Sequence, residues 1–390
     1  MERVKIGVIG CGTISEVYLA NFRDHYHNVE LAAVADLFVE KAKATAERFG
    51  VPVGCTAAEL LAMPEIQLVV NLTIPAAHYS VNRQILEAGK HAYCEKPLAL
   101  NVVEAKTLVA LAKEKGLMCV SAPDTFLGSG IQQSRDLIDS GAIGRPFGFT
   151  ANLYTPGHEL WHPNPGFYYQ KGGGPLYDMG PYYLTALIYL LGPIKRISAF
   201  TTIGRKVRNI LGTPKETEVD TTYTGIMEFA CGAVGTVYMS LDTWDASLPL
   251  LEIYGTEGTL YVPDPNFFQG DVRLLDGKKL GAMVEAVTAP HPARLITLFS
   301  NQKNGIEDVP VAFPHTADPQ LNMRGLGVSD MAQAILDGRS ARLSGSVSLH
   351  VVEALNAFDW SAQHGRAYEM QTTCARTAPM EKSWDMWEVR

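Results

Sequence analysis

Short apolar runs alternate with amphipathic stretches along the first third of the chain. The apolar runs are rich in β-branched residues, which is typical of strands buried in a parallel sheet. The stretches between them have helical periodicity, and several of them end in glycine, as helices do. The pattern predicts βαβ units with strands at residues 4–9, 30–36, 68–73, 91–94 and 117–121. The intervening helices are expected at 15–22, 39–49, 57–62, 77–88 and 102–115.

Beyond residue 125 this alternation stops, and glycine, proline and aromatic residues become more frequent. The change predicts a boundary near residue 123, with domains at 1–123 and 124–390. The expected fold class is α/β: a doubly wound parallel sheet, then an α/β domain with an open, largely antiparallel sheet. Strands of the second sheet are expected at 197–202, 223–229, 233–241, 249–254 and 258–262. Helices are expected at 132–140, 181–191, 328–336 and 346–364, and irregular structure at 203–218 and 263–325.

The composition narrows the class of protein. With 390 residues, 47% of them hydrophobic, the chain has enough apolar material for two globular domains. Its formal net charge of −8 gives no reason to expect binding to nucleic acid or to an anionic membrane. The six cysteines are scattered without metal-ligand spacing and are expected to be reduced thiols. The sequence shows no secretory signal and no apolar stretch of the roughly 20 residues that a membrane span needs, so a cytoplasmic protein is expected.

A glycine-rich turn follows the first predicted strand. It reads Gly10-Cys11-Gly12-Thr13-Ile14-Ser15, a variant of the dinucleotide-binding fingerprint in which serine replaces the third glycine. Gly10 permits a tight turn, Gly12 lets the backbone approach a pyrophosphate, and the next helix offers its free N–H groups and positive dipole end. We predict that Gly10, Gly12, Thr13 and Ile14 bind a dinucleotide. An ordinary glycine turn of an α/β sheet is the alternative.

An aspartate ends the second predicted strand. Asp36 lies 24 residues after Gly12, where a carboxylate accepts hydrogen bonds from the adenine ribose and repels a 2′-phosphate. Leu37 and Phe38 follow, so no arginine stands next to Asp36 to bind such a phosphate. NAD is therefore the expected cofactor, rather than NADP.

A second motif, Glu95-Lys96-Pro97, follows the fourth predicted strand. Doubly wound folds bind their ligands at the carboxyl edge of the sheet, so Lys96 is expected to point into that crevice. Glu95 either pairs with Lys96 or contacts the nicotinamide ribose. Taken without the rest of the motif, Glu95-Lys96 is more simply interpreted as an ordinary ion pair in a surface loop.

Four segments together resemble the Gfo/Idh/MocA family of NAD(P)-dependent sugar and polyol oxidoreductases. They are the fingerprint at 10–15, Pro75 with His78, the run AGKHAYCEKPLAL at 88–100, and the run GGGPLYDMG at 172–180. The resemblance implies a Rossmann domain followed by an α/β domain whose open sheet commonly serves in oligomerisation, and hence a homo-oligomer. It also implies a cofactor site that includes Thr73, Pro75, His78, Glu95 and Lys96.

The resemblance also implies catalytic positions. In the family, a lysine, an aspartate and a histidine four residues later meet at the substrate carbinol carbon; here they are Lys96, Asp178 and position 182, which is tyrosine. A phenol is a much weaker acid than an imidazolium, but the ammonium of Lys96 would favour the phenolate, so Tyr182 is expected to be the acid/base. Tyr183 and His158 are the other candidates for this role. The alternative is that Tyr182 is only a packing aromatic.

The segment His158-Glu159-Leu160-Trp161-His162 matches the H-E-x-x-H string of zinc proteases. Flanking prolines and glycines confine any helix there to about one turn, whereas zinc binding needs a continuous helix, so no metal is expected. We interpret the segment as a wall of a sugar pocket, with a rigid surface loop as the alternative. The expected substrate contacts are Lys96, Asp124, His158, Trp161, His162, Lys171, Asp178, Tyr182 and Tyr183.

These expectations favour an NAD-dependent oxidoreductase that removes hydride from a carbinol carbon of a sugar, cyclitol or sugar derivative. An alternative is an NAD-dependent glycoside hydrolase, in which transient oxidation acidifies a neighbouring C–H bond, elimination and water addition follow, and the cofactor is restored. A protein that binds the cofactor without catalysis is disfavoured because both Lys96 and Asp178 are present.

Overall fold

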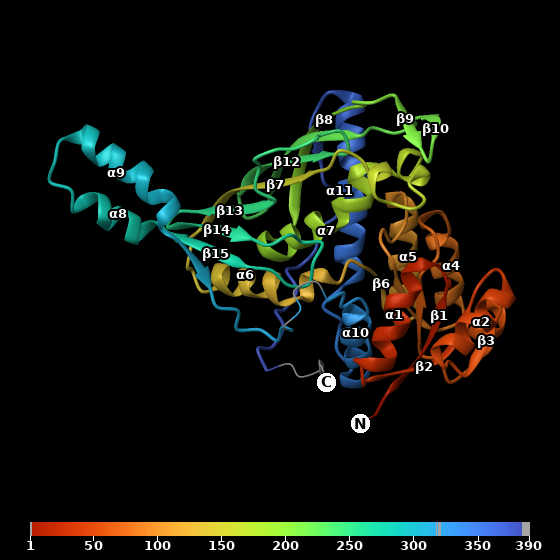
Figure 1. Cartoon of the computed structure of the whole chain (residues 1–390). Coiled ribbons are helices and arrows are strands. Elements are labelled where there is room, and N and C mark those ends of the chain that lie inside the picture. Colours follow the sequence, from red (N-terminus) through yellow and green to blue (C-terminus); the bar gives the residue numbers. More distant parts are fainter. Residues whose placement is uncertain (1, 317, 319–320, 384–390) are drawn as a thin grey trace.

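Two sheets organise the chain in the computed structural model, which describes residues 2–316, 318 and 321–383 (Figure 1). The first is a six-stranded parallel sheet with the order β3-β2-β1-β4-β5-β6. Its strands are β1 (Val4–Ile9), β2 (Val29–Ala35), β3 (Val53–Cys55), β4 (Leu68–Asn71), β5 (His91–Cys94) and β6 (Cys119–Ser121). The sequence predicted all of these except β3, which is too short to show as an apolar run.

Five helices connect the strands of this sheet, as the sequence predicted. They are α1 (Thr13–Asp24), α2 (Val39–Phe49), α3 (Ala57–Ala62), α4 (Pro75–Glu87) and α5 (Val102–Glu114). Helix α4 begins at Pro75, because proline loses no hydrogen bond at a first helical position. The strand order reverses between β1 and β4, so the loops after these two strands open a crevice at the carboxyl edge of the sheet. The doubly wound fold is confirmed.

The second sheet has nine strands in the order β16-β15-β14-β13-β7-β12-β11-β8-β17. Its described strand pairs are antiparallel, apart from β7 with β12. The strands are β7 (Pro146–Tyr154), β8 (Ile194–Thr202), β11 (Thr222–Phe229), β12 (Val234–Ser240), β13 (Leu251–Gly255), β14 (Gly258–Val262), β15 (Val272–Asp276), β16 (Ile306–Val309) and β17 (Tyr368–Glu369). The predicted open, largely antiparallel sheet is confirmed, although β7, β15, β16 and β17 were not predicted.

Both stretches that were expected to be irregular contain regular structure. Residues 203–218 form a hairpin of β9 (Val207–Ile210) and β10 (Thr213–Glu216), and every side chain of β10 is exposed, so no apolar alternation marks it. Residues 263–325 contain β15 and β16 with two helices between them, α8 (Gly277–Glu285) and α9 (His291–Asn304). Residues 317, 319 and 320 of this stretch lie outside the described part of the chain.

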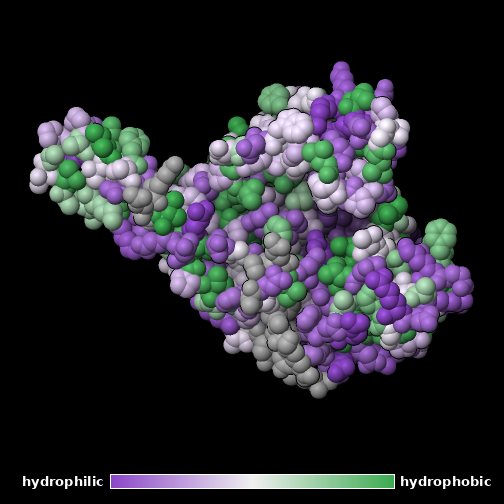
Figure 2. All heavy atoms as spheres, in the orientation of Figure 1, coloured by the Kyte–Doolittle hydropathy of each residue, from purple (hydrophilic) through white to green (hydrophobic). Residues whose placement is uncertain are grey.

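Helices α8 and α9 form an arm that projects from the edge of the second sheet (Figure 1). Hydrophobic residues lie on its surface (Figure 2), and they include Met283, Leu295, Ile296 and Phe299. No residue of α8 is buried. The prediction failed here because the two helices pack mainly on each other, and neither needs the wide apolar stripe that marks a core helix.

The remaining helices are α6 (Ser129–Asp139), α7 (Gly174–Leu191), α10 (Leu326–Asp337) and α11 (Gly345–His364). Helices α7 and α11 pack on one face of the nine-stranded sheet. The opposite face carries exposed apolar side chains, among them Phe200, Ile226 and Val234.

The predicted boundary near residue 123 falls between the two sheets, but α10 packs on β1, and α11 packs on α5 and β6. Within the described residues, no helix has both the length and the hydropathy that crossing a bilayer requires.

Candidate active site

The glycine-rich turn lies in the crevice between β1 and β4. Gly10 has φ +106°, and a Cβ there would lie 2.7 Å from the carbonyl group of Leu72, so only glycine fits. At Gly12 a Cβ would meet nothing within 4 Å, so its backbone faces open space. Helix α1 begins at the next residue, Thr13, and no side chain caps it, so the amides of Thr13 and Ile14 can bind a phosphate, whereas the Ser15 amide donates to the Gly12 carbonyl.

Asp36 lies beside this turn, at the end of β2. Its Oδ2 accepts a 2.8 Å hydrogen bond from the Cys11 amide, and its Oδ1 accepts one of 3.0 Å from the Phe38 amide. The Lys41 Nζ lies 3.9 Å from Asp36 Oδ2 and is half exposed. A carboxylate fixed next to the open space at Gly12 fits the adenosine half of a dinucleotide. The residues present therefore fit NAD.

His78 ties together the loops that follow β4 and β5. Its Nδ1 lies 2.6 Å from the Pro97 carbonyl oxygen and its Nε2 lies 3.0 Å from that of Thr73. The ring is fully buried, and this burial lowers the pKa of His78. His78 thus fixes Thr73 and the Lys96-Pro97 segment at the rim of the crevice, next to Pro75, the first residue of α4.

Glu95 does not pair with the side chain of Lys96, which was one of the two expectations for it. Its Oε1 accepts a 2.8 Å hydrogen bond from the Tyr18 hydroxyl, and its Oε2 accepts one of 3.0 Å from the backbone amide of Lys96. The Glu95 carboxylate is therefore held in place from α1 and from its own loop.

An ion pair between Lys96 and Asp178 lies at the centre of the crevice. The Lys96 Nζ lies 2.8 Å from Asp178 Oδ1 and donates a second hydrogen bond of 2.6 Å to the Asp178 backbone carbonyl. Burial opposes the charge on Lys96, but the Asp178 carboxylate outweighs it, and the pKa of Lys96 is raised. Burial likewise opposes ionisation of Asp178, but Lys96 and His158 together hold its pKa well below the ordinary value. Both groups are therefore charged.

Tyr182 lies one turn after Asp178 on α7. This helix begins at Gly174 and runs through Pro181, so the predicted start at residue 181 is wrong, and Asp178 already lies within the helix. The Lys96 Nζ lies 5.2 Å from the centroid of the Tyr182 ring, over its face. The hydroxyl oxygen instead accepts a 2.9 Å hydrogen bond from Arg324 Nη2. Lys96 was expected next to the Tyr182 hydroxyl. In the structure the cation at this hydroxyl is Arg324, which the sequence did not suggest.

His158 contacts Asp178 rather than lining the crevice. Its Nε2 lies 3.3 Å from Asp178 Oδ2, and its buried Nδ1 has no hydrogen-bond partner among the described residues. The His158 ring packs edge-on against Trp161, which is 65% exposed, and against Tyr168. Trp161 in turn packs edge-on against His162. These rings form one continuous group beside the Lys96–Asp178 ion pair, and Tyr168 is the member of the group that lines the crevice.

The H-E-x-x-H segment contains a short 3-10 turn, His158–Leu160, and no α-helix. The two histidines of this segment have different partners: His158 contacts Asp178, and His162 accepts a hydrogen bond from the Asn164 amide. Within the described residues, no group of three His, Cys, Asp or Glu side chains is arranged to hold a metal ion. Lys171 lies near these rings in sequence, but its side chain is exposed.

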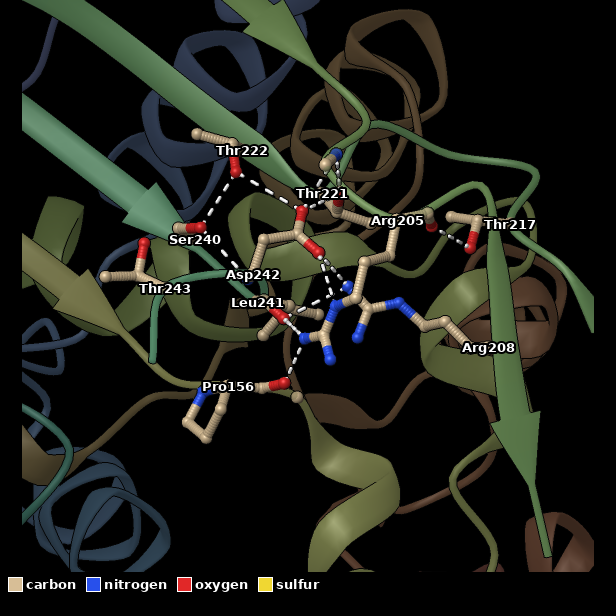
Figure 3. A network of polar contacts seen from close by, with 12 residues as sticks. Pro156, Arg205, Arg208, Thr217, Thr221, Thr222, Ser240, Leu241, Asp242 and Thr243 are labelled. Carbon is tan, nitrogen blue, oxygen red and sulfur yellow. Dashed lines mark hydrogen bonds and ion pairs between the residues drawn. The ribbon is translucent and has the colours of Figure 1, made fainter. Parts of the chain in front are cut away.

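A buried polar network holds the loop that carries His158 (Figure 3). Arg208, only 1% exposed, donates a 2.8 Å hydrogen bond to Glu159 Oε1 and also binds Asp242. Arg205 lies beside it, 3.2 Å from Asp242 Oδ1, and binds the carbonyl of Pro156. The hairpin β9–β10 and the end of β12 thereby fix the position of the loop around His158.

Asp124 and Tyr183, like His158, were expected at the substrate but have other partners. Asp124 is buried, and its Oδ2 accepts 3.0 Å hydrogen bonds from the amides of Gly325 and Gly327. Burial is the main reason that the pKa of Asp124 is raised to about 6. Tyr183 is fully buried, and its hydroxyl lies 3.4 Å from Asp264 Oδ1. Neither side chain lines the crevice: Asp124 binds the backbone at the start of α10, and Tyr183 lies in the hydrophobic core.

The crevice encloses about 940 Å³, including its open mouth, between the two domains. Seven of its lining residues were not among the predicted site residues, namely Pro97, Phe167, Tyr168, Gly172, Gly173, Tyr177 and Arg324. The aromatic residues stand close to the glycine run at 172–174 in the sequence, which could have marked them. No such signal existed for Arg324, which lies 142 residues from Tyr182.

The chain matches two family models. The model described as an oxidoreductase family with an NAD-binding Rossmann fold covers residues 4–122, and the Gfo/Idh/MocA C-terminal-domain model covers residues 131–261. An uncharacterized oxidoreductase of Schizosaccharomyces pombe is 31% identical over 211 residues, which are 51% of this chain and 54% of that protein. The chain thus spans about half the length of this relative.

The D-glucoside 3-dehydrogenase of Escherichia coli is 28% identical over 242 residues, 59% of this chain and 68% of that protein. Among solved structures, a complex of levoglucosan dehydrogenase with NADH and L-sorbose superimposes with a TM-score of 0.78 at 22% identity, covering 95% of this chain and 100% of that one. This likeness shows the fold. The chain belongs to the Gfo/Idh/MocA oxidoreductase family, and its first domain is an NAD-binding Rossmann domain.

Proposed function

We propose that this oxidoreductase uses NAD to oxidise a carbinol carbon of a sugar, cyclitol or sugar derivative. The observation that carries the proposal is the charged Lys96–Asp178 pair, with Tyr182 beside it, in the crevice that begins at the glycine-rich turn. The E. coli D-glucoside 3-dehydrogenase and the scyllo-inositol 2-dehydrogenase of Bacillus subtilis, 26% identical over 265 residues, support this substrate class.

Each of the three central residues has a distinct role in the proposed reaction. Lys96 stays protonated, so it serves as a hydrogen-bond donor to the substrate oxygen and stabilises negative charge that develops there. Asp178 fixes the direction of Lys96 through two hydrogen bonds. Tyr182 takes the hydroxyl proton. NAD, when bound, supplies the hydride acceptor.

Tyr182 suits the proton transfer better than the two other candidates. The Nε2 of His158 is engaged by Asp178 and its Nδ1 is buried, so neither nitrogen faces the crevice. Tyr183 points into the core toward Asp264. Tyr182 lines the crevice together with Lys96 and Asp178.

The other residues of the proposed site surround this centre. Around the cofactor we propose Gly10, Gly12, Thr13, Ile14, Asp36, Thr73, Pro75, His78 and Glu95. Around the sugar, Tyr168 would form one wall, with the ring group of His158, Trp161 and His162 packed behind it and the exposed Lys171 close by in the sequence. The exposed sheet face with Phe200, Ile226 and Val234 is the proposed surface for self-association, which sedimentation of the intact chain would show.

Asp36→Ala is expected to narrow the preference for NAD over NADP. The substitution removes both the acceptor for the ribose hydroxyls and the charge that repels a 2′-phosphate. Titration calorimetry with both cofactors measures the ratio of the two dissociation constants, and Glu40→Ala, an exposed carboxylate on α2, serves as the control. Tighter binding of NADP than of NAD by the unaltered protein would overturn the assignment.

Net oxidation and redox-neutral hydrolysis give different products. We expect NADH to accumulate, by its absorbance, when the protein and NAD are incubated with a panel of sugars, cyclitols and glycosides. In deuterated water, no solvent deuterium should enter the carbon next to the oxidised one. Release of a sugar that carries deuterium at that carbon, without accumulation of NADH, would contradict the proposal and establish the glycosidase alternative.

A further inference from the structure

Arg324 reaches the crevice from the segment that precedes α10. Its Nη2 donates the 2.9 Å hydrogen bond to the Tyr182 hydroxyl oxygen, and its Nη1 lies 2.9 Å from Asn322 Oδ1. Arg324 also lines the same crevice as Lys96 and Asp178. The guanidinium therefore directly contacts the oxygen atom to which the proposed mechanism assigns the proton.

The first domain fixes the backbone around Arg324. The side-chain amide of Asn21, on α1, donates 2.8 Å hydrogen bonds to the carbonyl oxygens of Asn322 and Arg324. The Tyr26 hydroxyl donates one of 2.5 Å to the Met323 carbonyl. On the other side, Asp124 accepts the amide hydrogens of the two glycines at 325 and 327. A guanidinium on so restrained a backbone is oriented before any ligand binds.

Among the charged groups of the described residues, Arg324 is the one that hydrogen-bonds to the Tyr182 hydroxyl oxygen. The other charged and titratable groups near Tyr182 have other partners or stay neutral. Lys96 lies over the face of the ring, and its charge is matched by Asp178. Tyr168, across the crevice, has its pKa raised by burial and next by the charge of Asp178, so it stays neutral. Glu95 interacts electrostatically with Arg324, but its carboxylate accepts hydrogen bonds from Tyr18 and from a backbone amide.

Arg324 itself remains charged. Burial opposes its charge, but Tyr182 and Glu95 more than offset this effect, and the pKa of Arg324 is raised. A cation held within hydrogen-bond distance of a phenol oxygen favours the phenolate over the neutral phenol.

We propose that Arg324 is a positioning residue for Tyr182: it orients the hydroxyl and stabilises the phenolate that accepts the substrate proton. In this step the substrate O–H bond breaks and the Tyr182 O–H bond forms. The electron pair of the carbinol C–H bond leaves as hydride to oxidised NAD, and the substrate becomes a carbonyl compound. The inference rests on the proposed function, because it needs Tyr182 to exchange a proton.

A guanidinium in a crevice has a second use, binding a carboxylate of the substrate. The two uses of Arg324 differ in whether they need the Tyr182 hydroxyl. If Arg324 stabilises the phenolate, its substitution has no effect once that hydroxyl is absent. If Arg324 binds a substrate carboxylate, its substitution has the same effect with or without the hydroxyl. A double-mutant cycle between positions 324 and 182 separates them.

The test uses the full chain with NAD and the best neutral sugar or cyclitol found for it. Arg324→Gln should lower kcat about 10- to 100-fold, the effect of one charge-assisted hydrogen bond, with little change in KM. The rise of kcat with pH should move about one pH unit or more to higher pH, because the phenolate forms less readily. Arg324→Lys, which keeps the charge, should recover part of the loss, and Arg273→Gln, an exposed arginine of β15, should match the unaltered protein.

In the Tyr182→Phe background, Arg324→Gln should have almost no further effect on kcat. Equal losses in both backgrounds, an unmoved pH profile, or a change confined to the KM of acidic sugars would overturn the inference. If Tyr182→Phe alone retains full turnover, the proposed function of Tyr182 fails instead. Thermal unfolding of each variant, with Arg324→Lys as the least disruptive, distinguishes these effects from a loss of fold.

Discussion

Lys96→Met is expected to lower turnover by about 100- to 1,000-fold, the usual effect of removing a donor that stabilises charge in the transition state. Methionine keeps the length and apolar stem of lysine but removes the ammonium that Asp178 holds in the crevice. The glycine turn and Asp36 are untouched, so the dissociation constant of NAD should change little. Steady-state kinetics and calorimetry measure these two quantities separately.

The matched control is Lys113→Met, an exposed lysine of α5. It should have the turnover of the unaltered protein. Removal of Lys96 also leaves the buried Asp178 carboxylate without its ammonium partner, with the 3.3 Å contact to His158 Nε2 still in place, so some loss of stability is expected. Turnover of Lys96→Met within a few fold of the unaltered protein would show that Lys96 is not part of the catalytic centre.

Tyr182→Phe should lower turnover about 100-fold or more, because it deletes the hydroxyl and keeps the ring. The ring packs in the core of the second domain, and this packing is preserved in phenylalanine. The hydroxyl has one described partner, Arg324, whose guanidinium lies in an open crevice where water can replace it. The melting temperature should therefore change little, and the pH dependence of the residual activity should differ from that of the unaltered protein.

Tyr183→Phe is the closest control for this substitution. It removes the hydroxyl of the adjacent tyrosine, which points to Asp264 and does not line the crevice. Near-normal turnover of Tyr183→Phe together with the loss in Tyr182→Phe would assign the proton transfer to position 182. The opposite pair of results would assign the proton transfer to Tyr183 and contradict the proposed role of Tyr182.

The parts of the fold that depend on local pattern could be predicted from the sequence. The strands of the parallel sheet are buried on both sides and read as apolar runs, and the turn at Gly10 and Gly12 has its own signature. The hairpin β9–β10 and the arm α8–α9 gave no such signal, because most of their side chains are exposed. Helix α7 was placed too late because Pro181 suggests a helix start, although here the helix continues through it.

In the candidate site, too, the residues that belong to local motifs could be predicted, and those placed by distant packing could not. Lys96, Asp178 and Tyr182 each stand in a short segment that the sequence displays, and the structure brings these three together. Asp124 stands at the expected junction, but its carboxylate turns away to bind the backbone amides of Gly325 and Gly327. Which way a buried side chain points depends on the packing of a distant segment, and local sequence does not contain that information.

The geometry of the proposed catalytic centre can be measured in a structure of the protein with NADH and the substrate alcohol, a pair that cannot react. We expect the reacting hydroxyl oxygen to lie within about 2.6–3.2 Å of both Lys96 Nζ and the Tyr182 hydroxyl oxygen, with its carbon facing the nicotinamide. A sugar whose reacting oxygen contacts neither group, and is held instead by His158 or Arg324, would contradict this expectation.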